Sequence, residues 1–261
     1  MRWIRYEADG GAAYGIVEGD DVAEVRGDPF AGYERTGAKR PFASVRLLVP
    51  VEPRTFYAAG LNYPEHAVAA ANSRGEIPKL PKTANIGYRA VNALIADGET
   101  IVIPSDATER VQYEGEIVAV VGRPMKRVAE ADVLSHLLGY TIGNDVSERT
   151  WQGEDTTLWR AKNTDTFAPM GPWIETDLDL DAAETIVRVN GAEKIRFPTN
   201  SMIFKIPHYL SRMSQYMTLH PGDVVWMGTE GKTENLKHGD TVEVEITGIG
   251  VLKNPVVREG A

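Results

Sequence analysis

The chain has 261 residues, of which 43% are hydrophobic and 25% charged, with a formal net charge of −9 and no cysteine. This length and composition are typical of a folded protein with one large domain, or with a small domain beside a larger one. The negative charge argues against nucleic acid or an anionic membrane as a partner, and no apolar run approaches the roughly 20 residues that span a bilayer.

The first fifty residues predict a small N-terminal β module. Short apolar stretches, some separated by Gly/Asp turns, predict strands at Trp3–Tyr6, Ala13–Val17, Val22–Val25 and Val45–Val49. One basic cluster, formed by Arg35, Lys39 and Arg40, is interpreted as solvated surface. We place this module at residues 1–50, ahead of a linker that runs from Pro50 to Pro53.

A larger domain is predicted over residues 54–258. It opens with a strand at Thr55–Ala59, and Pro64 suits the first position of a helix that runs to about Ser73. Two further helices are predicted, over Ala129–Leu137 and over Met202–Met217, and Pro207 marks a point where the second can be interrupted.

Strands dominate the rest of the larger domain. They are predicted at Thr100–Ile103, Glu114–Val121, Gly139–Gly143, Thr185–Val189, Val224–Met227 and Thr241–Ile246. Asn190-Gly191 predicts a hairpin turn. Strands and helices do not alternate regularly, and there is no glycine-rich phosphate loop, so we expect a mixed, strand-rich α+β fold.

Two glutamates stand where one of these strands begins, in Tyr113-Glu114-Gly115-Glu116. Alternate residues of a strand point to the same face, so the two carboxylates project together from a strand that is otherwise apolar on both faces. Adjacent buried carboxylates repel each other unless a cation or a shared proton holds them. With Asp145 as a third carboxylate, the cluster suits Mg²⁺, Mn²⁺ or Ca²⁺; the alternative is an ordinary solvated pair on an exposed strand.

A series of motifs runs in order through the larger domain. They are Gly60-Leu61-Asn62-Tyr63 with His66, Tyr113 to Glu116, Gly139-Tyr140-Thr141, Asn144-Asp145-Val146-Ser147 with Arg149, Lys162, Asp165, Phe167, Gly171-Pro172, Val189-Asn190-Gly191, Thr199, Met202-Ile203-Phe204, Pro221-Gly222-Asp223, Gly228-Thr229 and Gly248-Ile249-Gly250. In this order they resemble the catalytic domain of the fumarylacetoacetate hydrolase family, over roughly three quarters of the chain from about Ala59 to Val256.

This resemblance implies the fold, the metal and the partners. The fold is a strand-rich mixed β-sheet roll, and members of the family typically pair as homodimers. The metal is Mg²⁺ or Mn²⁺, for which Ca²⁺ can substitute, and its ligands here are Glu114, Glu116 and Asp145. The substrates are small 2-oxo acids or 1,3-dicarbonyl compounds, which chelate a divalent ion that then stabilises an enolate.

Four further residues are assigned to the site. Lys162 matches the family lysine near the metal, where its charge would neutralise a substrate oxyanion; the alternative is a surface lysine. Arg89 and Thr229 are expected to bind substrate. His66 is the candidate general base, on a helix that suits a lid, and the alternative is a packing histidine.

Several positions depart from the family pattern. In hydrolytic members, the lid histidine usually pairs with a glutamate three residues later, and Ala69 occupies that place here. Gln112 stands where an aspartate often precedes the tyrosine, Arg89 where lysine is common, Ile195 where a glutamine often binds substrate, and Glu230 where a proline follows Gly228-Thr229. The three carboxylates of the expected metal site match the family pattern, whereas several residues expected to face the substrate differ from it.

The first function hypothesis is a metal-dependent hydrolase that cleaves a C–C bond in an acylpyruvate-like acid. The second is a decarboxylase, hydratase or 2-hydroxymuconate-type isomerase on the same scaffold, which Ala69 favours because those reactions need less activation of water. The third is a non-catalytic protein that uses its metal to bind an oxo acid. A cytoplasmic location is expected, because the start of the chain has no signal-peptide core.

Overall fold

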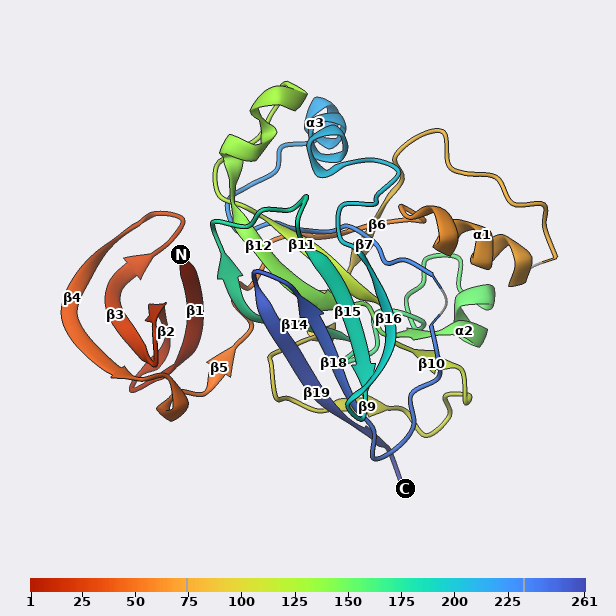
Figure 1. Cartoon of the computed structure of the whole chain (residues 1–261), viewed down its shortest axis with the longest axis horizontal. Coiled ribbons are helices and arrows are strands. Elements are labelled where there is room, and N and C mark those ends of the chain that lie inside the picture. Colours follow the sequence, from red (N-terminus) through yellow and green to blue (C-terminus); the bar gives the residue numbers. More distant parts are fainter. Residues whose placement is uncertain (74, 232) are drawn as a thin grey trace.

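The computed structural model of the chain describes residues 1–73, 75–231 and 233–261 (Figure 1). Strands greatly outnumber helices among these residues, so the predicted strand-rich α+β fold is confirmed. The largest sheet has the strand order β4-β3-β2-β1-β14-β12-β11-β17-β6-β7, with β5 and β8 attached to it, and a second sheet has the order β16-β15-β18-β19-β9.

The N-terminal residues form the end of the large sheet, at the left of Figure 1. Its strands are β1 (Arg2–Ala8), β2 (Gly11–Glu18), β3 (Asp21–Asp28), β4 (Gly32–Pro41) and β5 (Leu47–Leu48). Strand β1 also pairs with β14, at Trp3 opposite Ile174, so the sheet continues into the rest of the chain. Strand β4 was not predicted, because nearly all its side chains are exposed and no apolar alternation marks it.

The basic cluster of the sequence analysis lies on this unpredicted strand. Arg35 and Lys39 both contact the carboxylate of Glu18, at 2.6 and 2.9 Å, and Arg40 contacts Glu24 at 2.5 Å. The side chains of the three basic residues are a third or more exposed, so the interpretation as solvated surface is confirmed.

The remaining strands build the rest of both sheets. The large sheet continues through β6 (Phe56–Ala59), β7 (Ile86–Arg89), β8 (Leu94–Ile95), β11 (Gly115–Val121), β12 (Leu137–Asn144), β14 (Ala168–Glu175) and β17 (Val224–Trp226). The second sheet contains β9 (Ile101–Ile103), β15 (Glu184–Val189), β16 (Ala192–Pro198), β18 (Thr241–Ile246) and β19 (Gly250–Arg258), and a separate pair joins β10 (Val111–Gln112) to β13 (Ser147–Glu148).

The helices are short and lie outside the sheets. They are α1 (Pro64–Ser73), α2 (Arg149–Glu154), α3 (Ile206–Tyr216) and the 3₁₀ helices η1 (Phe42–Ser44), η2 (Val91–Ala93) and η3 (Glu130–His136). Helix α1 has its predicted bounds, whereas the helix expected over Ala129–Leu137 is the 3₁₀ helix η3. Within the described residues, no helix is long and apolar enough to cross a membrane.

Pro207 does not interrupt a helix, contrary to the prediction for Met202–Met217. Helix α3 begins at Ile206, so the proline lies in the first turn. The backbone N–H that proline lacks has no partner within a helix at that position, and the proline therefore starts the helix without breaking it.

Strand β11 is the centre of the fold, and its seven residues are all buried. It pairs with β12 on one side and with β17 on the other. Gly115 presses against the second sheet, because a Cβ built there would lie 2.8 Å from Val187 and 2.9 Å from Val244. Since neighbouring residues of a strand point to opposite faces, Glu114 and Glu116 are directed away from that sheet.

Candidate metal centre

Three buried carboxylates meet where β11 begins and β12 ends. Glu114 precedes β11, Glu116 lies within it and Asp145 follows β12; the two strands are antiparallel, with Gly115 opposite Asn144. One oxygen from each of the three side chains lies within 4.8 Å of the others, and each residue is at most 4% exposed. An enclosed set of carboxylate oxygens is what a hard divalent ion requires, so these residues fit Mg²⁺ or Mn²⁺.

The backbone around Asn144 holds these carboxylates in place. The side-chain oxygen of Asn144 accepts a hydrogen bond from the Glu114 backbone N–H at 3.0 Å. The Asp145 N–H donates to the Glu114 carbonyl oxygen at 2.9 Å, and the Ser147 hydroxyl donates to the Asp145 carbonyl oxygen at 2.8 Å. The Asn-Asp motif therefore ties the chain after β12 to the start of β11.

Three cations contact the same carboxylates. Lys162, only 4% exposed, donates from Nζ to Glu114 at 2.8 Å and to Asp145 at 2.6 Å, so the alternative of a surface lysine is wrong. Arg89 donates to both oxygens of Asp145, at 3.3 and 3.0 Å. Arg149 lies 2.7 Å from Glu114. The positive charges thus balance a fully ionised triad.

The pKa values of the three carboxylates shift in different directions: two are lowered and one is raised. Burial by itself would raise the pKa of Glu114, but Lys162 and Arg149 outweigh it and hold that pKa below its usual range. Burial likewise opposes ionisation of Asp145, and the contacts with Arg89 and Lys162 lower its pKa. In contrast, burial raises the pKa of Glu116 well above its usual value, and the charges of Asp145 and Glu114 add to the effect.

Metal binding is therefore expected to release a proton from Glu116. The raised pKa means that the folded, metal-free protein binds this proton more tightly than the unfolded chain, so Glu116 costs stability as the pH rises from its ordinary pKa toward the raised one. A metal ion needs the carboxylate, so Mn²⁺ affinity should rise with pH over that range. Calorimetry at mildly acidic pH, in buffers of different ionisation enthalpy, measures the released proton, and a binding enthalpy independent of buffer would contradict this prediction.

His66 reaches the same centre from helix α1. Its Nε2 lies 3.7 Å from Glu114, and its Nδ1 lies 3.0 Å from the carbonyl oxygen of Gly231. Thr229 is buried in the loop that contains Gly231. The structure thus brings His66, Lys162 and Arg89 close to the three carboxylates. Arg89 was expected to bind substrate, and in the structure it contacts Asp145.

The sequence analysis did not assign Arg149 or Glu230 to the site. Arg149 occurs in a matched motif, four residues after Asp145, and this spacing was the available signal. Its guanidinium also donates to the side-chain oxygen of Gln112 at 2.8 Å. Glu230 is buried and accepts hydrogen bonds from the backbone N–H groups of His66 and Gly231.

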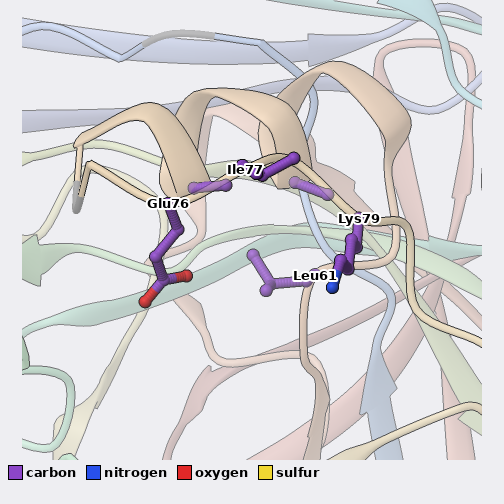
Figure 2. A pocket seen from close by; sticks show the side chains of 6 residues that line it. Leu61, Glu76, Ile77 and Lys79 are labelled. Atoms are coloured by element: carbon purple, nitrogen blue, oxygen red, sulfur yellow. The ribbon is translucent and has the colours of Figure 1, made fainter.

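Cavities lie on both sides of helix α1. One, of about 480 Å³, is next to the metal centre and is lined by Leu61, His66, Ala69, Ala70, Arg110, Gln112, Arg149, Gln152, Gly153, Leu158, Gly231 and Thr233. The other, of about 420 Å³, is lined by Leu61, Ala67, Ala71, Glu76, Ile77 and Lys79. Figure 2 shows Leu61 between Glu76 and Lys79 in this second cavity, with the helix above them.

Comparisons with known proteins match two parts of the chain to two family descriptions, and the larger match agrees with the family resemblance of the sequence. Residues 55–257 match the family described as fumarylacetoacetate (FAA) hydrolase C-terminal, and residues 1–50 match the one described as Rv2993c-like, N-terminal. The mitochondrial oxaloacetate tautomerase FAHD2A of Bos taurus is 33% identical over 230 residues, which cover 83% of this chain and 71% of that protein.

Two solved structures are similar over almost their full length. The 5-carboxymethyl-2-hydroxymuconate delta-isomerase from Mycobacterium smegmatis is 39% identical, with a TM-score of 0.90, and the match covers 99% of this chain and 100% of that one. The maleylpyruvate hydrolase from Sphingobium sp. SYK-6, in complex with manganese(II) and pyruvate, is 25% identical, with a TM-score of 0.79 and 99% of each chain covered.

Proposed function

Because the chain belongs to the fumarylacetoacetate hydrolase family, we propose that it is a divalent-metal-dependent enzyme that isomerises 2-oxo acids carrying a second carboxylate. The reaction moves a proton, and with it a double bond, between carbon and oxygen or between two carbons. The similarity to a 5-carboxymethyl-2-hydroxymuconate isomerase and to an oxaloacetate tautomerase supports this choice, since both names describe such reactions on acids with two or more carboxylates.

Glu114, Glu116 and Asp145 would hold Mg²⁺ or Mn²⁺. When bound, the ion supplies Lewis-acid chemistry, which favours negative charge on the oxygen of a 2-oxo group. Lys162 lies against two of the three carboxylates, so its ammonium group is placed to bind an anionic substrate oxygen beside them. In the low dielectric of a buried site, such a charge is worth far more than in water.

The charge of the site favours an anionic substrate, although the whole chain is acidic. Lys162, Arg89 and Arg149 already balance a fully ionised triad, so a bound divalent ion would leave the site with an excess of positive charge. The adjoining cavity adds Arg110 and presents Arg149 to its contents. Guanidinium groups bind carboxylates through paired hydrogen bonds, which suits a second carboxylate at this end of the substrate.

One observation favours isomerisation over hydrolysis: a carbonyl group, and not a carboxylate, holds Nδ1 of His66. The carboxylate partner that usually accompanies the lid histidine in hydrolytic members of the family is therefore not supplied at Nδ1. Isomerisation needs no activated water, so it does not require that pairing. His66 would then move a proton from carbon next to the 2-oxo group to the other end of the enolate, and no water would be consumed.

Hydrolysis of a C–C bond in an acylpyruvate-like acid is the second candidate. The similarity to a maleylpyruvate hydrolase bound to manganese and pyruvate supports it. The two reactions differ in their products, because hydrolysis gives two fragments and isomerisation gives none.

A turnover screen decides between them. Oxaloacetate, a 2-hydroxymuconate-type diacid and an acylpyruvate are each incubated with the protein and Mn²⁺, with excess chelator as the control, and products are identified by NMR. We expect isomeric products that require Mn²⁺ and are lost in His66→Asn. Fragments would establish the hydrolase, and tight binding without turnover of any substrate would refute both.

The homodimer expected from the resemblance is also proposed here. Light scattering at micromolar concentration should give twice the 28.7 kDa mass of the chain. A monomer at that concentration would contradict it.

A further inference from the structure

Glu230 is a buried carboxylate that lies outside the three-carboxylate cluster. It is 7% exposed, and one of its oxygens accepts two backbone hydrogen bonds, from His66 and from Gly231, both at 3.1 Å. The first bond joins two parts of the chain that are 164 residues apart. Glu230 therefore ties the first turn of helix α1 to the loop that follows β17.

The same loop also holds the imidazole of His66. The Gly231 carbonyl oxygen lies 3.0 Å from Nδ1, and a carbonyl oxygen can only accept a hydrogen bond, so Nδ1 carries the proton of the neutral ring. Nε2 then has a free lone pair, on the side where Glu114 lies 3.7 Å away. The loop thus fixes both the backbone of His66 and the tautomer of its side chain.

Gly231 can present its carbonyl in this direction because it is glycine. Its φ of +68° lies in the left-handed region, and a Cβ there would meet Ile195 at 2.5 Å. Helix α1 itself offers no carboxylate at position 69, which shares a helix face with His66 but holds Ala69. The contact between Nδ1 and the Gly231 carbonyl oxygen therefore helps to orient the imidazole.

Helix α1 lines two cavities and is joined to the loop by a hydrogen bond in its first turn. His66, Ala69 and Ala70 face the cavity next to the metal centre, while Ala67 and Ala71 face the second cavity. The bond from the His66 N–H to Glu230 joins the first turn of the helix directly to a buried part of the fold.

We propose that Glu230 is a positioning residue, which fastens helix α1 to the loop containing Gly231 so that Nε2 of His66 faces the metal centre. This assignment deepens the proposed function, and rests on it where His66 acts as the base. The hydrogen bonds from the backbone N–H groups of His66 and Gly231 to Glu230 exist whether or not the protein turns a substrate over.

The test compares Glu230→Ala with Glu230→Gln in the full-length protein. The amide oxygen of Gln can accept the same two N–H bonds, whereas Ala removes them. We expect Glu230→Ala to lower kcat about 10- to 100-fold, less than the roughly 10²- to 10⁴-fold of a whole acid–base contribution because His66 itself remains, with KM changed less than threefold. Glu230→Gln should recover most of that loss. Glu234→Ala, which removes an exposed glutamate from the same segment, serves as the matched control.

Two further measurements need no turnover. Hydrogen exchange of peptides covering α1 should be faster in Glu230→Ala than in the natural protein or in Glu230→Gln. The ¹⁵N shifts of His66, assigned by comparison with His66→Asn, should show Nδ1–H in the natural protein and a mixture of tautomers in Glu230→Ala. Unchanged exchange and unchanged shifts in Glu230→Ala would overturn the proposal, even if the screen above found no substrate at all.

Discussion

Replacing Glu116 with Gln is expected to abolish Mn²⁺ binding and to lower turnover by at least about 100-fold, while the fold stays intact. Changes to groups that merely support metal ligands typically cost about 10- to 100-fold in affinity or activity, so the loss of a ligand should cost more. The fold should tolerate this change because the pKa of Glu116 is raised by burial and by its acidic neighbours, so that the protonated side chain already resembles an amide. The amide oxygen of Gln can also accept the 2.7 Å hydrogen bond from the Gly228 N–H.

Thermal unfolding separates the two effects of this substitution. Without metal, Glu116→Gln should have a Tm equal to or above that of the natural protein, since an amide takes the place of a protonated carboxyl group and does not ionise as the pH rises. With Mn²⁺ at about 100 times its Kd, the natural protein gains about 2.7 kcal/mol of stability, and the variant should gain none. Glu243→Gln, which alters a glutamate paired with Lys253, is the control and should bind Mn²⁺ normally. Normal Mn²⁺ binding by Glu116→Gln would refute the assignment of Glu116 as a ligand.

Replacing Lys162 with Met is expected to destabilise the metal-free protein by about 3–5 kcal/mol, the usual cost of removing one partner from a buried ion pair. Lys162 contacts Glu114 and Asp145 at 2.8 and 2.6 Å, and it is fully enclosed with them. Without its charge, each carboxylate loses one of the two cations that hold its pKa below the usual range, and keeps the other, Arg149 for Glu114 and Arg89 for Asp145. A divalent ion can replace part of that charge, so added Mn²⁺ should restore part of the lost stability.

Added Mn²⁺ should restore part of the stability of Lys162→Met, but it should not restore the activity of this variant. The ammonium group is placed to bind a developing oxyanion, and removing one such donor typically costs about 10²- to 10³-fold in turnover. Urea unfolding in chelator and in Mn²⁺ measures the stability, and steady-state kinetics in saturating Mn²⁺ measures the activity. Lys194→Met breaks an ion pair with the exposed Glu234 and should change neither. Unchanged stability in chelator would show that Lys162 does not compensate the buried carboxylates.

Local sequence determined the elements whose signals lie within a few residues. Helix α1 begins at Pro64 because proline suits a first turn, and this signal does not depend on the rest of the fold. Strand β11 is apolar on both faces, which indicated burial, and all its residues are buried. The alternation of side chains along that strand placed Glu114 and Glu116 on one face, and their oxygens converge with that of Asp145.

Two secondary-structure predictions differ from the structure, at β4 and at η3, for reasons that lie in the local sequence. Strand β4 lies at the end of the large sheet with nearly all its side chains exposed, so it carries no apolar pattern to recognise. The segment Glu130–His136 has the composition of a short helix, but hydrogen bonds of the 3₁₀ and α types differ in register and not in residue preference.

The sequence by itself determined which carboxylates meet, because strand alternation and the pairing of two strands close in sequence are local properties. The resemblance assigned Lys162, Arg89 and His66 to the site, and only the tertiary structure decided which carboxylate each of them contacts and how Glu230 holds His66. Arg89 lies 56 residues from Asp145, Lys162 lies 48 from Glu114, and Glu230 lies 164 from His66. These contacts arise where separate strands and loops pack together, and no pattern of neighbouring residues encodes such a distance. The position of Nε2 of His66, on which the proposed chemistry depends, is therefore set by a loop that the sequence places far from it.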